Sequence, residues 1–587
     1  MPFKSPDWAP QLQGDIPDNV SVADFMLDPV YGRHALENSR PPFVCGISGK
    51  ALSTLAVKDH VEQLASGLAS ELGWKVGQGN ALDMVVCIYS LNTIDYLPLI
   101  WAVHRLGGVV APASSEFSVS DLTSQLKASR TSCVFTCLPL LKTAIASAAA
   151  AGIPRYRVYL LELPEVFAAP TRDTTVFKNT SQLAQQGARQ PRLEGLKWAE
   201  GAAKKQVAFL CYSSGTSGLP KGVMISHYNV VASICQVCAF ESPCRELLRK
   251  ASGTHVYMEN VLGLLPLSHI YGLIMIAHCA AWRGDSTVIL PKFELKTFLC
   301  AIQDHEINTL FLVPPIIIFM MNNHKLLSEY TLESVKVVFT GAAPLGYETA
   351  QQLSSLYPGW LIRQAYALTE TCAVVSSSAH FDTWLGSAGS LITGVEARIV
   401  DMDGAEVTEY GKTGELLVKS PSLVMGYLND DKANRETFVS DENGDIWMRT
   451  GDEVAINKSP GGHEHLFIVD RIKELIKVKG LQVAPAELET HLLLSPLVED
   501  CAVIAVPDDR AGEVPKAYVV KASGIHGDET ARQAILKHVQ EHKSPHKWLK
   551  GGVEFVKEVP KSPSGKILRR VLKLREQEKR EKTRAKL

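Results

Sequence analysis

The sequence lacks the features that would mark a nucleic-acid-binding, membrane-spanning or secreted protein. Its 587 residues carry 60 Lys and Arg against 62 Asp and Glu, a formal net charge of −2. This balance does not favour nucleic acid as a partner. No basic and apolar signal peptide opens the chain. The longest apolar stretch, 310–321, holds two prolines and is too short for a transmembrane segment. We therefore expect a soluble protein.

Cysteine is also scarce, with 12 in the whole chain. This number does not indicate a disulfide scaffold in a protein of such length. The tightest cluster is Cys235, Cys238 and Cys244 with His227 nearby, but a zinc site would need a second ligand pair at matching spacing. The sequence therefore predicts buried free thiols and a reducing compartment.

A Walker A loop is missing, because Glu406 stands where the glycine before Gly411-Lys412-Thr413 would have to be. Instead, the apolar run 206–211 predicts a buried strand that leads into a polar, glycine-rich segment. Its glycines, hydroxyls and lysine suit a polyphosphate better than they suit an ordinary flexible surface loop. The candidate phosphate-binding residues are Ser213, Ser214, Gly215, Thr216, Ser217, Gly218 and Lys221.

At this segment the sequence resembles the adenylate-forming superfamily, which contains acyl-CoA synthetases, peptide-synthetase adenylation domains and luciferase-like enzymes. Further matches follow in the family's order up to Lys566, so the resemblance covers most of the chain. Within the superfamily the sequence looks most like 4-coumarate–CoA ligase and related fungal acyl-CoA ligases. The resemblance implies an enzyme that uses ATP, magnesium (Mg²⁺) and coenzyme A.

Strand-like and helix-like segments alternate from residue 84 to residue 345, which predicts an α/β fold with doubly wound parallel sheets. Residues 1–45 are expected to form an irregular arm, and 170–203 a polar loop. Short strands after residue 394, including 445–448 and 453–456, predict a small β subdomain. By resemblance, a large N-terminal domain spans 1–472 and a mobile, small α+β C-terminal domain spans 473–587.

The resemblance assigns roles around the nucleotide. Thr369 would bind phosphate, Glu370 would hold Mg²⁺, and Tyr366 would stack on adenine. Asp452, helped by Arg471, would bind the ribose hydroxyls, although a turn aspartate is the alternative at Asp452. The remaining residues that match nucleotide-binding positions are Gly341, Ala342, Ala343, Gln364, Lys477 and Gln482.

The C-terminal matches imply a two-step reaction. Lys566, in a loop shaped by Pro563 and Gly565, matches the lysine that contacts the carboxylate and the α-phosphate during adenylation. Lys473 matches the hinge about which the C-terminal domain rotates. Lys479 and Gly480 match the loop that borders the path of coenzyme A. A solvated basic segment is the alternative for the lysines.

The segments that match the acyl pocket are apolar. By resemblance, His269 is predicted to be catalytic together with Lys566 and Thr369. It also begins the segment, continued by Ile270 and Tyr271, that lines the pocket and gates access of coenzyme A. The other pocket matches are in 367–374. This chain has Ala367 where the coumarate enzymes have glycine, which disfavours a bulky hydroxycinnamate. No acidic residue stands between 265 and 273, which argues against an amino-acid substrate. The predicted pocket residues are Ile270, Tyr271, Ala367, Ala373 and Val374, beside Gly341.

The predicted function is therefore that of an ATP-dependent acid–CoA ligase, which forms acyl-AMP and pyrophosphate and then the acyl-CoA thioester. One alternative is transfer of the acyl group to a carrier protein, although the stretch after Lys566 is too short to be a carrier domain. A luciferase-like oxygenase is another. A non-enzymatic binding protein would lack a catalytic group, and none is missing.

The chain ends in Ala585-Lys586-Leu587 after a basic, helix-like run. This ending resembles the Ser-Lys-Leu address that is read by the peroxisomal import receptor. We therefore expect a peroxisomal protein, or a cytoplasmic one if the tripeptide is not read.

Overall fold

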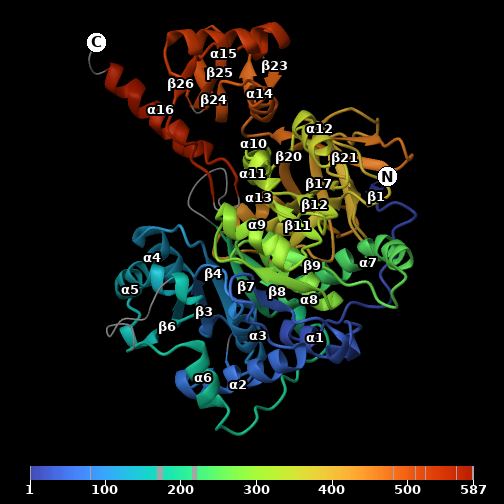
Figure 1. Cartoon of the computed structure of the whole chain (residues 1–587), viewed down its shortest axis with the longest axis vertical. Helices are drawn as coiled ribbons and strands as arrows, with labels where there is room; N and C mark the ends of the chain where they lie inside the picture. Colours follow the sequence, from blue (N-terminus) through green and yellow to red (C-terminus); the bar gives the residue numbers. More distant parts are fainter. Residues whose placement is uncertain are drawn as a thin grey trace.

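The computed structural model describes residues 2–79, 81–167, 176–213, 221–479, 481–508, 510–522, 524–562 and 565–584. A large N-terminal domain holds three sheets, and a small C-terminal domain has its own sheet and hydrophobic core (Figure 1). The α/β architecture that the sequence predicted is confirmed. Within these ranges no helix is both long and apolar enough to cross a bilayer. All of the cysteines are free thiols, and most are buried.

The first sheet has seven strands and carries the predicted phosphate loop at one of its hairpins. Strands β4, β3, β5, β6 and β7 run parallel, and β7 turns back antiparallel into β8. The strands, in order across the sheet, are β18 (Gly426–Tyr427), β8 (Lys221–Ser226), β7 (Val207–Ser213), β4 (Val109–Ala113), β3 (Val85–Tyr89), β5 (Cys133–Thr136) and β6 (Val158–Leu160).

The second sheet has eight strands. Six of them run parallel, and β14 and β15 are added antiparallel at one edge. The strands in order are β15 (Ser390–Leu391), β14 (Ala373–Ser377), β13 (Leu361–Leu368), β12 (Val337–Thr340), β11 (Thr309–Leu312), β9 (Asn260–Gly263), β10 (Ser286–Ile289) and β2 (Phe43–Cys45). Their apolar faces are buried on both sides, as expected of parallel strands between helices.

The helices of the large domain cover these two sheets. A π-helical segment, Tyr271–His278, follows β9 and leads into α8. Such segments are rare and occur frequently at functional sites. The α-helices are α1 (Val22–Leu27), α2 (Thr54–Leu72), α3 (Tyr96–Arg105), α4 (Val119–Ala128), α5 (Leu141–Ala150), α6 (Thr180–Gly187), α7 (His227–Ser252), α8 (Cys279–Arg283), α9 (Leu295–Asp304), α10 (Pro314–Asn322), α11 (His324–Leu327), α12 (Tyr347–Leu356) and α13 (Asp431–Thr437).

The third sheet forms the small β subdomain and is antiparallel throughout. Its strands are β1 (Phe3–Lys4), β16 (Glu396–Val400), β17 (Gly414–Lys419), β20 (Ile446–Lys458), β19 (Phe438–Ser440) and β21 (Glu464–Arg471). Because β1 is its edge strand, the first residues of the chain lie against a segment that follows almost 400 positions later.

The C-terminal domain is an α+β unit. Its core joins a five-stranded sheet to α14 (Pro485–Leu492), α15 (Glu529–His542) and the start of α16 (Arg569–Arg584). In Figure 1 this domain lies at one end of the molecule, and α16 leads away from it. The strands are β23 (Leu481–Val483), β22 (Ile476–Val478), β25 (Gly512–Lys521), β24 (Val498–Asp508) and β26 (Val553–Phe555).

Three local expectations were wrong. The arm 1–45 contains α1 and two short strands, and the loop 170–203 contains α6. This helix forms because Asn179 caps it and because Gly187 packs so closely on α2 that an added Cβ would lie 1.8 Å from the Gln63 carbonyl oxygen. The strands expected at 445–448 and 453–456 are one strand, β20, bent by a bulge at Glu453 and Val454.

Candidate active site

The ends of the predicted phosphate loop are held by the β7–β8 hairpin. Ser213, the last residue of β7, is paired across the hairpin with Lys221, the first residue of β8. Residues 214–220 lie outside the described residues, so the predictions for Ser214, Gly215, Thr216, Ser217 and Gly218 stay predictions. The buried strand 207–211 and the hydroxyl and ammonium groups that flank the loop are in the predicted places.

Glu370 is the centre of a group of oxygen atoms next to this hairpin. It lies in the turn Thr369–Thr371, directly after β13. Its Oε1 accepts hydrogen bonds from the Ser213 hydroxyl (3.1 Å) and the Tyr427 hydroxyl (3.0 Å). The Lys221 ammonium lies 4.9 Å from the centre of the Tyr427 ring. A carboxylate among hydroxyls is a donor set that suits a hard divalent cation.

Asp452 and Arg471 are paired directly across β20 and β21. The Arg471 Nε lies 3.3 Å from the Asp452 Oδ1, and the Tyr366 hydroxyl donates a hydrogen bond to the same carboxylate. Burial raises the pKa of Asp452, while Arg471 acts in the opposite direction. The residues predicted at the adenosine end are thus brought together from three strands.

The loop after β12 lies beside them. The buried Gln364 holds it in place, because its Oε1 accepts a hydrogen bond from the Leu345 amide at 3.0 Å. A Cβ added at Gly341 would lie 3.5 Å from the Tyr271 ring. Ala342 has a φ of 67°, a left-handed conformation that costs energy for a residue with a Cβ. Such strain occurs frequently at ligand-binding loops.

Lys566 reaches this group from the C-terminal domain. The turn that presents it needs Gly565, whose φ is +80° and whose added Cβ would lie 3.2 Å from Val313. Burial and the nearby Arg471 lower the pKa of Lys566 to about 8, while Glu474, Asp452 and Glu370 act to raise it. The charges of these nucleotide candidates therefore act on the Lys566 ammonium, although 95 residues separate it from Arg471 in the chain.

His269 lies where the Lys566 loop meets the large domain. Burial, followed by the charge of Lys566, lowers the pKa of His269 to about 4. The imidazole is therefore neutral at pH 7, and its Nδ1 accepts a hydrogen bond from the Tyr271 amide at 3.3 Å. A neutral ring at this point separates the basic loop from the apolar residues that follow.

The predicted acyl-pocket residues occur in two groups. Ala367 is paired with Val374, and Leu368 with Ala373, in the β13–β14 hairpin. Ala373 has a φ of 107°, a conformation that strains a residue with a side chain. The second group, Ile270 and Tyr271, is buried at the start of the π-helical segment.

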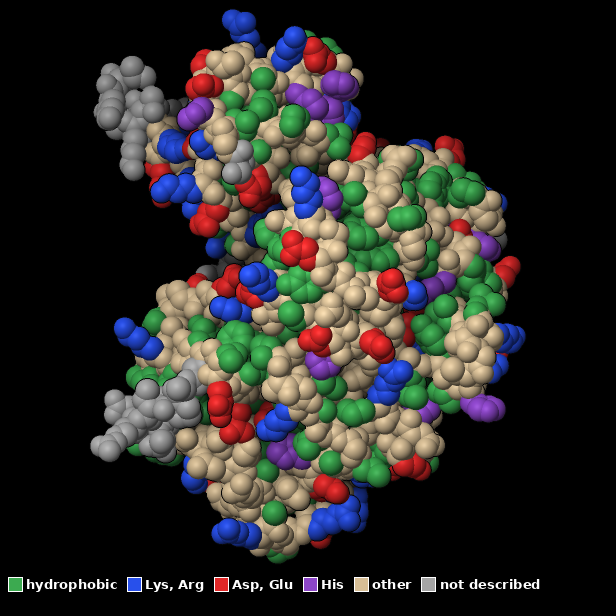
Figure 2. Space-filling model, viewed as in Figure 1, with side chains coloured by type: hydrophobic (Ala, Val, Ile, Leu, Met, Phe, Trp, Pro, Cys, Tyr) green, Lys and Arg blue, Asp and Glu red, His purple; other side chains and the backbone are tan. Residues whose placement is uncertain are grey.

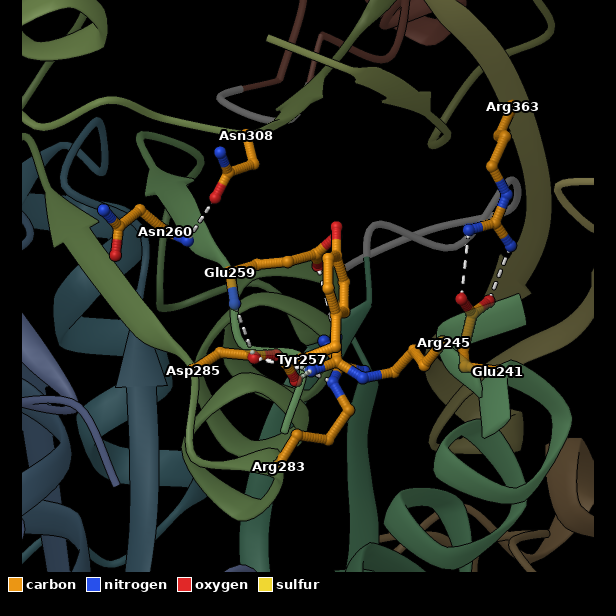
Figure 3. A network of polar contacts seen from close by, with 9 residues as sticks. All are labelled: Glu241, Arg245, Tyr257, Glu259, Asn260, Arg283, Asp285, Asn308 and Arg363. Carbon is orange, nitrogen blue, oxygen red and sulfur yellow. Dashed lines mark hydrogen bonds and ion pairs between the residues drawn. The ribbon is translucent and has the colours of Figure 1, made fainter. Parts of the chain in front are cut away.

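The Tyr271 side chain leads through Phe339 to a buried network of charges. Figure 3 shows the charged residues of this network. The Tyr271 hydroxyl donates to the Phe339 carbonyl oxygen at 3.0 Å, and the Arg363 guanidinium covers the Phe339 ring at 5.1 Å. Arg363 pairs with Glu241 at 2.6 Å. Phe339, Arg363 and Glu241 also line a cavity of about 20 Å³, which is room for a single water molecule. This network therefore lies behind the aromatic side chains of Tyr271 and Phe339.

The other predicted residues are exposed in the C-terminal segment. Lys473 precedes β22, Lys479 lies between β22 and β23 with a φ of 51°, and Gly480 is outside the described residues. The Lys477 amide donates to Glu513, and the Gln482 side chain lies 3.8 Å from the Met402 sulfur. In the described parts of the chain, no hydrogen bond or ion pair joins these residues to Glu370 or Asp452.

Tyr427, Asp430 and Glu474 belong to the site but were not found from the sequence. Tyr427 binds Glu370, Asp430 lies 3.7 Å from the Lys221 ammonium, and Glu474 acts on Lys566. None of them is part of a glycine-rich or otherwise recognisable local pattern. The signal for Tyr427 is the pairing of β18 with β8, which only the folded chain shows.

Comparison with known proteins identifies the two parts of the chain. Residues 33–428 match the family model described as AMP-binding enzyme, and residues 487–566 match the AMP-binding enzyme C-terminal domain. The chain is 39% identical to the acyl-CoA ligase cm3C of Cordyceps militaris over 98% of its own length and 90% of that protein. It is 40% identical to the acyl-CoA ligase easD of Emericella nidulans over 98% and 100%.

Solved structures share the fold at lower identity. The structure of an anthranilate CoA ligase in complex with anthranoyl-AMP is 20% identical, with a TM-score of 0.77 over 95% of this chain and 98% of that one. ATP-bound MatB from Rhodopseudomonas palustris is 23% identical, with a TM-score of 0.75 over 94% and 98%. These likenesses concern the arrangement of both domains.

Proposed function

Because the chain belongs to the AMP-binding enzyme family and is an AMP-forming acid ligase, we propose that it makes an acyl-CoA thioester in two steps. The acid carboxylate attacks the α-phosphorus of ATP, which gives acyl-AMP and pyrophosphate. The thiol of coenzyme A then attacks the acyl carbon, and AMP leaves. The observation that carries the proposal is the electrostatic effect of Arg471, Asp452 and Glu370 on the buried ammonium of Lys566.

We assign the adenylation step to this group of side chains. Lys566 contacts the carboxylate and the α-phosphate, where negative charge develops as the new bond forms. Asp452 and Arg471 hold the ribose, and Tyr366 stacks on the adenine base. Ser213, Lys221 and Thr369 bind the phosphates at the other end of the nucleotide.

Glu370, with the Ser213 and Tyr427 hydroxyls, would hold Mg²⁺, because all three groups offer oxygen ligands. The bound ion would neutralise charge on the phosphates. Tyr427 keeps the Glu370 carboxylate in place by its hydrogen bond and supports Lys221 by its ring. It is therefore a positioning residue for the phosphate end of the site.

The acyl body would lie against the β13–β14 hairpin and the aromatic wall formed by Tyr271, Phe311 and Phe339. The predicted pocket residues Ile270, Tyr271, Ala367, Ala373 and Val374 are apolar except for the Tyr271 hydroxyl, which is already bonded to a backbone carbonyl. We therefore propose a medium-chain or slim aryl-alkyl acid as the substrate. Hydroxycinnamates are disfavoured by the methyl group of Ala367.

The thioester step would need the C-terminal domain to turn about Lys473, taking Lys566 out of the site and bringing Lys479 and Gly480 toward it. Lys473→Pro fixes φ at this point and should slow the step that depends on rotation. We expect normal acyl-AMP formation and slower CoA transfer in stopped-flow measurements. Unchanged rates of both steps would remove Lys473 as the hinge.

The decisive experiment measures pyrophosphate release for a panel of acids with and without coenzyme A, and identifies the product by mass. We expect pyrophosphate with the slim acids and a thioester only when coenzyme A is present. Acyl-AMP that accumulates without reacting with coenzyme A would favour a carrier protein as the acceptor. An oxidised product that requires oxygen would favour the luciferase-like alternative.

We also propose that Ala585 to Leu587, which lie outside the described residues, direct the protein to peroxisomes. The location in the cell of a fluorescent protein fused to the N-terminus tests this proposal. Puncta that overlap peroxisomes should disperse when the tripeptide is deleted. Puncta that survive the deletion would contradict the proposal.

A further inference from the structure

The π-helical segment Tyr271–His278 begins with Tyr271 of the predicted acyl pocket and is buried along its whole length. Its bonding is wider than that of an α-helix, because the amide of Cys279, which follows the segment, donates to the carbonyl oxygen of Ile274 five residues back. π-Helical bonding is rare and occurs mostly as single turns inside α-helices. A segment of eight residues is therefore expected to need support beyond its own backbone bonds.

His278, the last residue of the segment, supplies such support. Its Nδ1 donates to the carbonyl oxygen of Leu273 at 2.7 Å, and its Nε2 accepts a hydrogen bond from the indole Nε1 of Trp101 in α3 at 3.1 Å. A carbonyl oxygen only accepts and an indole N–H only donates, so both bonds require the same neutral tautomer, with the hydrogen on Nδ1. Burial lowers the pKa of His278 to about 4, although the bond to Leu273 acts to raise it, so the ring is neutral at pH 7.

Both rings of this pair are buried, with His278 0% and Trp101 1% exposed. The histidines visible at the surface in Figure 2 therefore do not include His278. Buried polar groups require partners within the protein, because an unpaired one loses its hydrogen bonds to water. Leu273 and Trp101 are the partners of the two ring nitrogens, so neither nitrogen of His278 is left for a ligand. The role of the ring is therefore to hold its neighbours in place.

The bond from His278 to Leu273 favours π-helical over α-helical bonding. It spans five residues, the spacing of a π-helical backbone bond, whereas the carbonyl one turn back in an α-helix is four residues away. If the segment returned to α-helical bonding, the residues before it would rotate about the helix axis by roughly 100°, the angle between successive α-helical residues. Ile270 and Tyr271 would then leave their present positions.

Two other buried side chains hold the same stretch of chain. The Thr287 hydroxyl, in β10, donates to the carbonyl oxygen of Ile276 at 3.2 Å. Before the segment, the Asn92 Nδ2 donates to the carbonyl oxygen of Leu265 at 3.0 Å. The chain is therefore fixed on both sides of Tyr271.

We propose that His278, oriented by Trp101, is a positioning residue for substrate selection, because it keeps the π-helical turn that places Tyr271 in the wall of the acyl pocket. This role rests on the proposed function, which assigns the acyl body to the aromatic wall of Tyr271, Phe311 and Phe339. The Tyr271 hydroxyl donates to the Phe339 carbonyl oxygen at 3.0 Å, so rotation of the segment would break this bond and move the ring. His278 would thus affect which acid fits without touching the acid.

The test compares the parent enzyme with His278→Leu, whose side chain is close to histidine in volume but makes neither hydrogen bond. KM and kcat are measured by pyrophosphate release for octanoic acid as the slim acid, for cinnamic acid as the bulky acid, and for ATP. We expect KM for octanoic acid to rise about 10-fold or more, and the preference for octanoic over cinnamic acid to fall by a similar factor, because one methylene-sized change in a pocket discriminates by roughly 10- to 200-fold. KM for ATP and kcat should stay within a few-fold, since a rise in KM at constant kcat identifies lost binding.

His465→Leu is the matched control. His465 is also a buried histidine, 1% exposed, and its Nδ1 lies 2.8 Å from the Ser387 hydroxyl, but it belongs to β21 of the β subdomain. Both variants should lower the melting temperature, whereas only His278→Leu should change the KM for the acid. An equal change of acid preference in His465→Leu would show that general loss of stability is responsible and would overturn the proposal.

If His278→Leu does not fold, as judged by circular dichroism, Thr287→Val replaces it. This variant removes another side-chain bond to a carbonyl of the π-helical segment and keeps the shape of the side chain, so it should shift acid preference in the same direction by a smaller factor. An unchanged KM and preference for the acids in the folded variant, with an active parent, would overturn the positioning role and leave the proposed function intact. A parent that releases pyrophosphate with no acid would contradict the proposed function itself, and the positioning role with it.

Discussion

Two groups of buried charges in this protein differ in whether partner charges or burial dominate the pKa values of their residues. The first, behind Tyr271, consists of three arginines and three carboxylates (Figure 3), and each guanidinium has a close partner. Arg245 and Arg283 both bind Asp285, at 2.7 and 2.9 Å, and Arg363 binds Glu241. Burial alone would raise the pKa of Glu241, but Arg363 overcomes this effect and lowers it to about 2.

The second group contains Lys566, Arg471 and Asp452, and here burial dominates. The pKa of Lys566 is lowered to about 8, and that of Asp452 is raised. Burial therefore destabilises the charged forms of Lys566 and Asp452, whereas Asp452 and the neighbouring groups stabilise the charged form of Arg471. Perturbed pKa values of this kind are typical of functional sites, whereas complete ion networks are typical of structural ones.

The difference teaches what each group requires. In the network behind Tyr271, each arginine is paired with a carboxylate, and Arg363 also covers the ring of Phe339, whose carbonyl oxygen accepts the Tyr271 hydrogen bond. In the group around Lys566, burial and Arg471 destabilise the Lys566 ammonium more than the nearby carboxylates stabilise it, and the phosphates of ATP would add negative charge. A buried charge that is not compensated within the protein is thus a better indicator of the ligand than the fold itself.

The largest effect on stability should come from breaking the network of arginines and carboxylates behind Tyr271. Arg363→Met leaves Glu241 buried without its partner, and loss of one member of a buried pair costs about 3–5 kcal/mol in the free energy of unfolding. We expect urea denaturation to show this loss.

The double variant Arg363→Met/Glu241→Leu is the control, because removing both charges should recover much of the stability. A loss below about 1 kcal/mol in Arg363→Met would contradict the view that this network is structural. Equal losses in the single and double variants would show that the effect arises from packing.

The next largest effect concerns the group around Lys566. Lys566→Ala should slow acyl-AMP formation by about 10²–10³, the usual cost of losing a contact to developing charge. CoA transfer from supplied acyl-AMP should be nearly unchanged. Single-turnover measurements of each half-reaction distinguish the two.

Lys561→Ala is a matched control in the same loop, since Lys561 pairs with Asp500 of the C-terminal domain at 2.7 Å. We expect this variant to keep its adenylation rate within a few-fold. Equal losses of both half-reactions in Lys566→Ala would remove Lys566 as the adenylation lysine.

A smaller effect is expected on stability without substrate. The pKa of Lys566 is about 8 in the folded protein, against 10.5 for an unperturbed lysine, so the unfolded chain binds the proton more tightly. The cost to folding is therefore full below pH 8 and disappears as pH rises toward 10.5. At 1.36 kcal/mol for each pKa unit, this cost to the free energy of unfolding is on the order of 3 kcal/mol.

Lys566→Met should therefore be more stable than the parent at pH 7, with a smaller advantage at pH 9.5. Chemical denaturation at both values checks this. Saturating ATP should reverse the order at pH 7, because the nucleotide stabilises the parent more strongly. A variant that is less stable at pH 7 without ATP would show that the Lys566 charge is already compensated.

The sequence was sufficient for those parts of the structure that local patterns determine. The apolar run 206–211 correctly predicted β7, and strand–helix alternation correctly predicted the parallel sheets. Helix α6 was missed because it depends on close packing against α2, through Gly187 of α6 and Gly67 of α2. No local pattern marks that contact.

In the candidate active site, too, only residues that lie in local sequence patterns could be predicted. Glu370, Asp452 and Lys566 could be found by resemblance because they lie in recognisable motifs. Tyr427 and Asp430 could not, because they reach the site through the pairing of β18 with β8. The charges behind Tyr271 come from four separate segments of the chain, so their mutual compensation was equally invisible in the sequence.

The smallest predicted effect is on substrate choice at the proposed acyl pocket, which adjoins the network behind Tyr271. Ala367 is paired with Val374 beside the irregular step in the β13–β14 hairpin, and in the proposed pocket its methyl group would narrow the space for the acyl body. Ala367→Gly should raise kcat/KM for bulky cinnamate-type acids by about 10-fold or more, because one methylene-sized change is worth about 1–3 kcal/mol. Slim acids, which do not reach this methyl group, should be nearly unaffected. If the parent enzyme already prefers hydroxycinnamates, or if the glycine variant shows no shift between the two classes of acid, Ala367 does not set the width of the pocket.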